Sequence, residues 1–223
     1  METRRAIEDR RSVRAFTDQP VDRAVLETIL TLARCAPSGA NLQPGRFHVL
    51  TGAPLKSLSD ALLDGIAEDR PQVSEYSYFP RPMPADLKAR QRAAGFALYD
   101  ALGIEKRDLE GRKAQFQHNY RFFGAPVGMI ITIHREMGAG CFMDLGMAIQ
   151  TMLLAVHDAG LAACGIGAMA NYGDLIHDHL GLDADEMVVA GVAIGYAADH
   201  PVNDFRTERD ALDVFATFRG FES

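Results

Sequence analysis

The sequence predicts a single domain built from α-helices and buried β-strands. Three observations predict it: a helical repeat over residues 22–36, and continuous apolar runs of strand length at 126–133 and 187–196. Apolar residues make up 48% of the 223 residues and charged residues 24%, close to the average for globular proteins. No repeat, low-complexity tract or linker divides the chain, so we expect one domain over 1–223.

The first half of the chain gives clear local signals. Apolar residues recur on one face of 22–36, Asp22 is a typical N-cap, and Pro37 ends the helix. Two prolines and two glycines indicate a loop at 37–45. The remaining elements expected here are a short strand at 46–52 and helices at 54–69 and 84–103.

The second half contains the most apolar segments. Residues 141–161 are apolar nearly all round, which is typical of a helix buried in a large core or an interface. A further helix is expected at 171–180, before the apolar run 187–196. The polar tail 197–223 carries four phenylalanines, so we expect it to pack on another surface, such as a second subunit.

Composition excludes several functional classes. The net charge of -7 argues against a wide nucleic-acid or anionic-membrane surface. Cys35, Cys141 and Cys164 are odd in number and far apart, and the histidines of 177–179 do not share a helix face, so neither a disulfide framework nor a metal site is indicated. The N-terminal charges and the short length of the apolar segments predict a cytoplasmic protein.

GIGAMA at 165–170 matches the glycine pattern of dinucleotide-binding folds. A helix runs almost to the motif, however, and no acidic residue follows the next strand directly. We favour glycines that let the backbone approach a flat ligand or another chain. A Rossmann dehydrogenase remains the competing interpretation.

Arg10, Arg11 and Arg14 surround Ser12 in IEDRRSVRAF. Guanidinium groups form bidentate hydrogen bonds with phosphate, and a serine hydroxyl can complete such a site. A solvated basic face at the end of a helix over 3–10 explains the same residues equally well. Arg206 and Arg209 could converge on the same anion.

Several segments, taken in order, resemble the nitroreductase family of FMN-dependent oxidoreductases, in particular its bacterial nitroaromatic-reducing branch. They are RRSVRAF, ARCAPSGANLQPGRF, the strand AP-V-x-x-I-I, GLAACGIGAM and a late arginine. The resemblance implies an α+β fold with a central mixed, mostly antiparallel sheet flanked by helices. It also implies an intertwined homodimer with FMN at the subunit interface and the tail 197–223 packed on the partner.

The resemblance also assigns cofactor-binding residues. The arginine segment would bind FMN, the loop after Pro37 would lie along the flavin of the second subunit, and a backbone N–H near Gly165 would reach the ring. The full set is Arg10, Arg11, Ser12, Arg14, Pro37, Ser38, Gly39, Asn41, Gly165, Ile166, Gly167, Arg206 and Arg209.

Substrate contacts are expected from the proline-rich loop 70–84, where Tyr76, Tyr78 and Phe79 can stack on an aromatic ring. Packing of these rings against a partner subunit is equally open. The excursion of about 60–118 would form a substrate lid. Arg121, before the central strand, is a further candidate contact to the flavin or substrate.

The implied activity is reduction of nitroaromatic or related electron-poor compounds by two-electron, ping-pong hydride transfer. NADH or NADPH would be the electron donor, tightly bound FMN the cofactor, and a small aromatic molecule the substrate. No protein acid is required, so no catalytic residue is assigned. Alternatives are an enone or quinone reductase, a reductive dehalogenase, or a non-catalytic flavin-binding protein.

Overall fold

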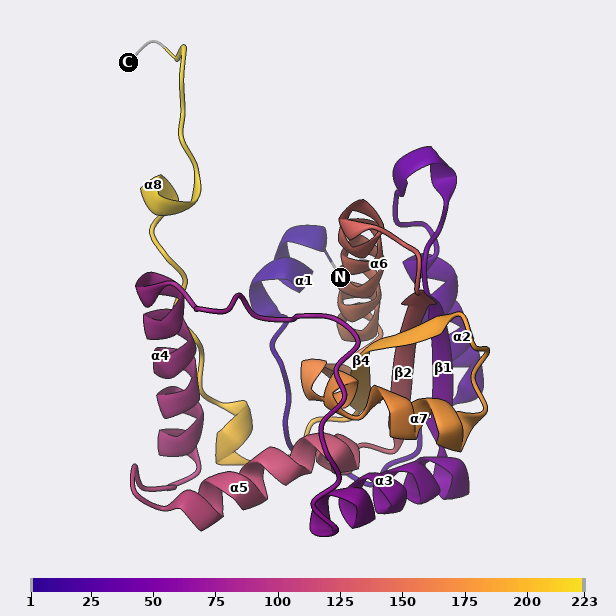
Figure 1. Ribbon diagram of the computed structural model, residues 1–223. Helices are drawn as coiled ribbons and strands as arrows, with labels where there is room; N and C mark the ends of the chain where they lie inside the picture. Colours follow the sequence, from indigo (N-terminus) through magenta and orange to yellow (C-terminus); the bar gives the residue numbers. More distant parts are fainter. Residues whose placement is uncertain (1, 222–223) are drawn as a thin grey trace.

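A four-stranded antiparallel sheet forms the centre of the molecule (Figure 1). The computed structural model describes residues 2–221. The strand order is β1-β2-β4-β3, and each neighbouring pair is antiparallel. The strands are β1 (Arg46–Thr51), β2 (Val127–His134), β3 (Ala162–Ile166) and β4 (Glu186–Gly195). The expected α+β class and mostly antiparallel sheet are confirmed.

Helices cover both faces of the sheet. The α-helices are α1 (Thr3–Asp9), α2 (Arg23–Ala33), α3 (Gly52–Ala67), α4 (Ala85–Ala101), α5 (Leu109–Gln117), α6 (Ala139–Asp158), α7 (Gly173–Leu180) and α8 (Leu212–Phe215). The 3-10 turns are η1 (Gly39–Asn41), η2 (His118–Gly124), η3 (Gly167–Asn171) and η4 (Pro201–Asn203). Two expectations are corrected. No pattern in the sequence predicts α5 or α8, and the helix expected at 171–180 begins at Gly173 because the 3-10 turn η3 precedes it.

The two faces of the sheet form two hydrophobic cores. Side chains alternate along β2, so Met129 and Ile131 face α2 and α6 whereas Ile130 faces α3, η2 and α7. All three are fully buried. Because both faces are covered, β2 and β4 are apolar throughout, which explains the continuous apolar runs in the sequence.

A β-bulge lies where β2 meets β4, between Ile131 and Thr132. Ile131 pairs with Ala190 and Thr132 pairs with Val188, which leaves Val189 as an extra residue on β4. A bulge changes which residues face each side of the sheet. On β4, Val189 and Val192 therefore face the same core although three positions separate them.

Helix α6 presents much of its apolar surface to solvent. Within residues 2–221 it is the one helix long and apolar enough to span a membrane by length and composition alone. It packs on α2 and β3, yet Met143 is 70% exposed and Met147 is 40% exposed. This exposed apolar surface is available for packing in an interface.

The α4–α5 excursion and the C-terminal tail stand apart from the two cores (Figure 1). Neither α4 nor α5 contains a buried residue. Leu58 and Leu62 of α3 are fully buried, so the part outside the core begins after Ala67 rather than near residue 60. An ion pair of 2.8 Å between Arg90 and Asp210 connects α4 to the tail.

Candidate functional site

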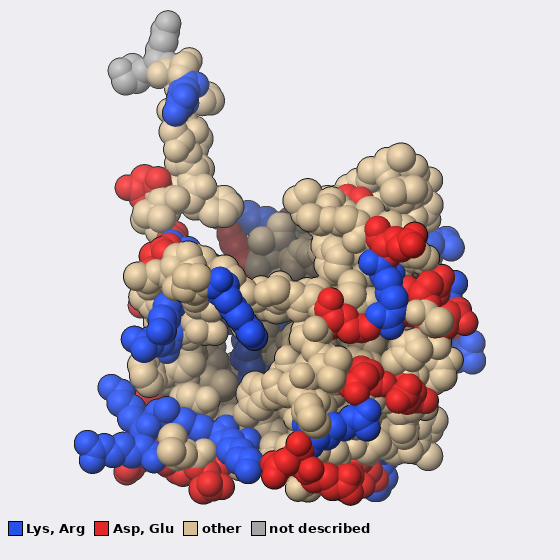
Figure 2. Space-filling view, viewed as in Figure 1, with Lys and Arg blue, Asp and Glu red and all other residues tan. Residues whose placement is uncertain are grey.

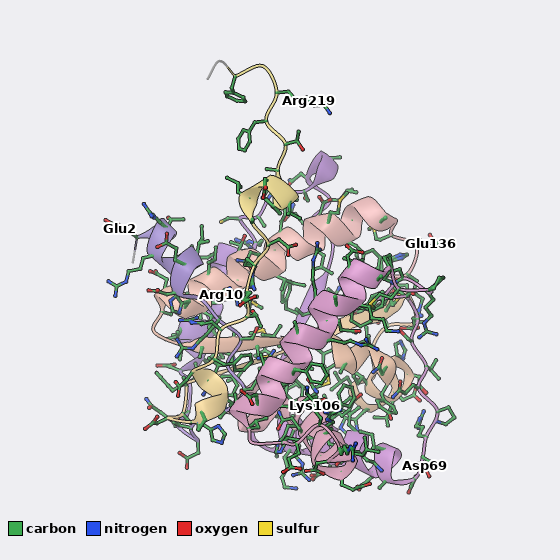
Figure 3. All side chains as sticks on the ribbon, turned by 90° about the vertical axis from the view of Figure 1, so that its left-hand side faces the viewer. Glu2, Arg10, Asp69, Lys106, Glu136 and Arg219 are labelled. Carbon is green, nitrogen blue, oxygen red and sulfur yellow. The ribbon has the colours of Figure 1, made fainter. Side chains whose placement is uncertain are left out.

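Arginines from both ends of the chain line one cavity of about 300 Å³. The lining includes Arg10, Arg11, Ser12, Arg14, Phe205, Arg206 and Arg209. Figure 3 shows Arg10 beside the C-terminal segment. Burial lowers the pKa of Arg10, and the charges of Arg209 and Arg206 lower it further. Like charges therefore lie close together in this cavity.

This positive charge is not balanced within the cavity. Its one carboxylate, Glu8, forms an ion pair of 2.8 Å with Arg4 on the same helix. Arg206 Nη1 donates to the backbone oxygen of Asp9 at 3.2 Å, and Arg209 Nη1 donates to Thr207. Within residues 2–221, none of the five arginines lining the cavity has an ion-pair partner. The arrangement suits a bound anion.

Backbone pairing holds the arginine segment against the edge of the sheet. Ser12 forms a parallel bridge with Ala163 of β3, and Val13 N donates to Ala163 O at 3.1 Å. Thr17 N donates to Tyr196 O at 2.9 Å. The segment therefore lies beside β3 although about 150 residues of sequence separate the two.

Asn203 joins the arginine segment to the tail. Its side chain is buried and accepts a hydrogen bond from Arg14 N at 2.8 Å. The same amide donates to Ala15 O and Ala198 O, each at 2.9 Å. Sequence reasoning missed this residue, because an asparagine in a polar tail carries no signal of its tertiary contacts.

A second cavity, of about 820 Å³, lies at the end of β3. Gly167, Tyr76, Tyr78 and Phe79 all line it. A Cβ on Gly167 would lie 3.1 Å from Tyr78 Cε2, so close approach of the Tyr78 ring favours glycine there. The structure thus brings the three aromatic residues to the GIG segment.

Tyr76 differs from its two aromatic neighbours. Its hydroxyl donates to Val189 O at 2.6 Å, and its ring contacts Phe142 with centroids 5.7 Å apart. Burial raises the pKa of Tyr76 to about 12. Tyr78 and Phe79 are 62% and 49% exposed, so their rings are free to contact a ligand.

Strand β3 connects the two cavities. Ser12 pairs with Ala163 near its start, and Gly167 follows its end. Four residues of strand span about 13 Å. This arrangement suits an elongated ligand with an anionic group at one end and a flat ring at the other. The segment after β3 is the 3-10 turn η3, which does not fit the long helix that a Rossmann phosphate site needs.

The loop after Pro37 lies elsewhere in the single chain. Its residue Ser38 lines a different cavity of about 550 Å³, together with His48 of β1. Ala40, Asn41 and Gln43 have positive φ, and Gly39 N donates to Asp144 Oδ2 at 3.1 Å. The loop is therefore held to α6 by a hydrogen bond, and it does not reach the arginine cavity of its own chain.

Arg121 is exposed on η2. Burial lowers the pKa of the neighbouring His118, and the charge of Arg121 lowers it further. The arginine and aromatic cavities form without Arg121 in their linings. Its predicted contact to flavin or substrate stays a prediction.

The sequence as a whole matches a known family. A family model described as the nitroreductase family matches residues 7–196. The chain belongs to the nitroreductase family. Among curated relatives, it is 37% identical to a 4-nitrobenzoate reductase of Pseudomonas putida, over 97% of this chain and 95% of that protein. It is 35% identical to a chloronitrobenzene nitroreductase of Comamonas testosteroni, over 95% and 94%.

Solved nitroreductase structures agree with this fold. The FMN and NADPH-dependent nitroreductase NfnB from Sphigopyxis sp. strain HMH has a TM-score of 0.97 and 41% identity, covering 99% of this chain and 100% of that chain. The FMN-dependent nitroreductase NfnB from Mycobacterium smegmatis, in complex with NADPH, has a TM-score of 0.93 and 30% identity, with 97% of each chain covered.

The residues that line the two cavities can be compared with the chemistry of FMN. The uncompensated arginine cavity matches a phosphate, and the open backbone of β3 matches a flat ring. A Cβ on Gly165 would meet no heavy atom within 4 Å, so the face of the sheet is open at that position. The residues present therefore fit FMN.

Proposed function

We propose that this chain is an FMN-dependent oxidoreductase that uses NAD(P)H to reduce nitroaromatic compounds. The observation that carries the proposal is the connection of two cavities by β3, one with unpaired arginines and one with aromatic walls beside Gly167. The relatives are named for both a charged substrate, 4-nitrobenzoate, and a neutral one, chloronitrobenzene. Their names leave the charge of the substrate open.

In this proposal, the residues of this chain bind and orient FMN and the aromatic substrate. Arg10, Arg206 and Arg209 would hold the phosphate of FMN, and Arg14, which lines the same cavity, would place its charge toward the ring. Gly165 and Gly167 leave the backbone of β3 free to lie along the ring. Tyr78 and Phe79, whose side chains are exposed, would pack on a bound aromatic ring and keep water from it. Bound FMN supplies two-electron hydride chemistry from nicotinamide to nitro group, with ping-pong kinetics.

The proposal includes a homodimer with the cofactor at the interface. Exposed apolar side chains on α6 and exposed phenylalanines in the tail supply surface for a partner; Phe215 is 86% exposed. The loop after Pro37 does not line the arginine cavity of its own chain. It is therefore available to contact the cofactor of a partner subunit. A cytoplasmic location, where NAD(P)H is available, is part of the proposal.

The absorbance spectrum of the purified protein tests the function directly. We expect flavin peaks, or uptake of added FMN, followed by bleaching with NADPH and recovery with a nitroaromatic compound. Arg10→Ala should weaken FMN binding at least tenfold, because a charge-assisted contact is lost. Arg92→Ala, on exposed α4, is the matched control. A protein that neither contains nor takes up flavin would overturn the proposal.

A further inference from the structure

The aromatic cavity has walls suited to a second flat ring. Tyr78 and Phe79 meet edge to face with centroids 4.8 Å apart. Phe116 of α5 also lines the cavity and packs edge-on against Tyr120 with centroids 5.9 Å apart. Rings arranged in this way leave faces and edges on which an aromatic substrate can pack.

Two side chains of opposite charge line the same cavity, Glu75 and Arg81. Glu75 forms an ion pair with Arg135, so its charge is compensated. Arg81 is exposed, and within residues 2–221 it has neither an ion pair nor a side-chain hydrogen bond. Arg81 is therefore the uncompensated charge of the aromatic cavity.

The surroundings favour the approach of an anion. Figure 2 shows lysine and arginine side chains gathered over α4 and α5, in a chain whose net charge is -7. Helix α5 contributes Phe116 to the cavity. A locally positive surface steers anionic ligands toward such a site.

We propose that Arg81 binds the carboxylate of an aromatic substrate, so that the protein prefers nitrobenzoate-type compounds to neutral nitrobenzenes. The proposal rests on the proposed function, because it names the substrate class of the same cleft. A guanidinium donates two parallel N–H bonds to a carboxylate. Arg81 follows Phe79 by two residues, so one loop supplies both the ring contact and the charge contact.

Ligand binding tests the charge contact without turnover. We would measure the affinity of the FMN-loaded protein for benzoate and for neutral benzamide by calorimetry. Arg81→Gln should weaken benzoate binding about tenfold and leave benzamide within twofold. Arg81→Lys should retain part of the benzoate affinity. Arg92→Gln makes the same chemical change on exposed α4, outside the cavity, and should leave both ligands unchanged.

Kinetics with two substrates tests the selectivity. Arg81→Gln should lower kcat/KM for 4-nitrobenzoate about tenfold and leave kcat/KM for nitrobenzene within twofold. The phosphates of NADPH are another source of negative charge, so KM for NADPH is measured in the same variants. A rise confined to KM for NADPH would assign Arg81 to the electron donor and overturn the proposal.

Two further results would overturn the proposal: equal losses for benzoate and benzamide, which would mean that Arg81 only shapes the loop, or no benzoate binding by the unsubstituted protein. Failure of the proposed function looks different. In that case neither nitro compound is reduced by the flavin-loaded protein, whatever residue stands at position 81.

Discussion

At the scale of single residues, Asn203 shows how one buried amide positions several charges. It contacts the backbone on both sides of Arg14 and the chain that leads to Arg206. The amide carries no charge and lies outside the lining of the arginine cavity. It is thus a positioning residue for the proposed phosphate site.

Asn203→Ala should weaken FMN binding about tenfold and lower the free energy of unfolding by about 1–3 kcal/mol, since buried backbone groups lose their partner. Asn203→Asp keeps the acceptor for Arg14 N but loses both donated bonds, so it should be intermediate. Flavin fluorescence gives the affinity, and urea unfolding gives the stability.

Thr132→Val is the matched control for Asn203. Thr132 is also buried and donates to Glu186, but it lies in β2, away from the arginine cavity. It should lower stability without changing the affinity for FMN. Unchanged FMN affinity in Asn203→Ala would assign Asn203 to the fold alone.

At the scale of elements, the first part of loop 70–84, residues 70–76, is bound to the rest of the fold, whereas Tyr78 and Phe79 are exposed. Val73 pairs with Tyr172, Arg70 forms an ion pair of 2.8 Å with Asp174, and Tyr76 bonds to β4. Tyr78 and Phe79 follow this fixed part. The two rings beside Gly167 therefore belong to a loop whose first residues are held by hydrogen bonds and an ion pair.

Tyr76→Phe should loosen the attachment of loop 70–84 to β4, because it removes the 2.6 Å hydrogen bond to Val189 O. We expect a loss of about 1 kcal/mol in the free energy of unfolding. Amide hydrogen exchange should become faster in 77–84 but not in β4. Tyr99→Phe is the control, since Tyr99 contacts Arg112 through its ring. Unchanged exchange in 77–84 would show that other contacts hold the loop.

How well each element could be predicted depends on where its apolar residues lie. The amphipathic helix α2 and the buried strands β2 and β4 have strong patterns, and the sequence predicts all three. Helix α5 is exposed and its sequence, LEGRKAQFQ, has few apolar residues, so no periodic pattern reveals it. The arginines at 10–14 are recognisable by motif. No local pattern encodes the tertiary hydrogen bonds of Asn203 or the place of Arg81 in the aromatic cavity.

At the scale of the whole molecule, exposed apolar surface on α6 predicts association. Met143→Glu should weaken the proposed dimer at least tenfold, because a charge would be buried in the proposed interface. Analytical ultracentrifugation measures the change. Leu109→Glu on α5 is the matched control, since Leu109 and Met143 are both 70% exposed.

Flavin retention should follow the dimer if the loop after Pro37 completes the site from the other subunit. Met143→Glu should then also lose FMN on dilution, whereas Leu109→Glu should keep it. A stable dimer in Met143→Glu would place the interface away from this part of α6.

The arginine cavity takes its charges from residues 10–14 and from 206–209, so nearly the whole chain separates its two halves. During synthesis, the first arginines leave the ribosome long before their partners exist. The proposed phosphate site can form only after Arg206 and Arg209 have been synthesised. Capture of FMN in the proposed site would therefore wait for the second group of arginines, and a chain that stops before Arg206 would lack two of the five arginines that line the cavity.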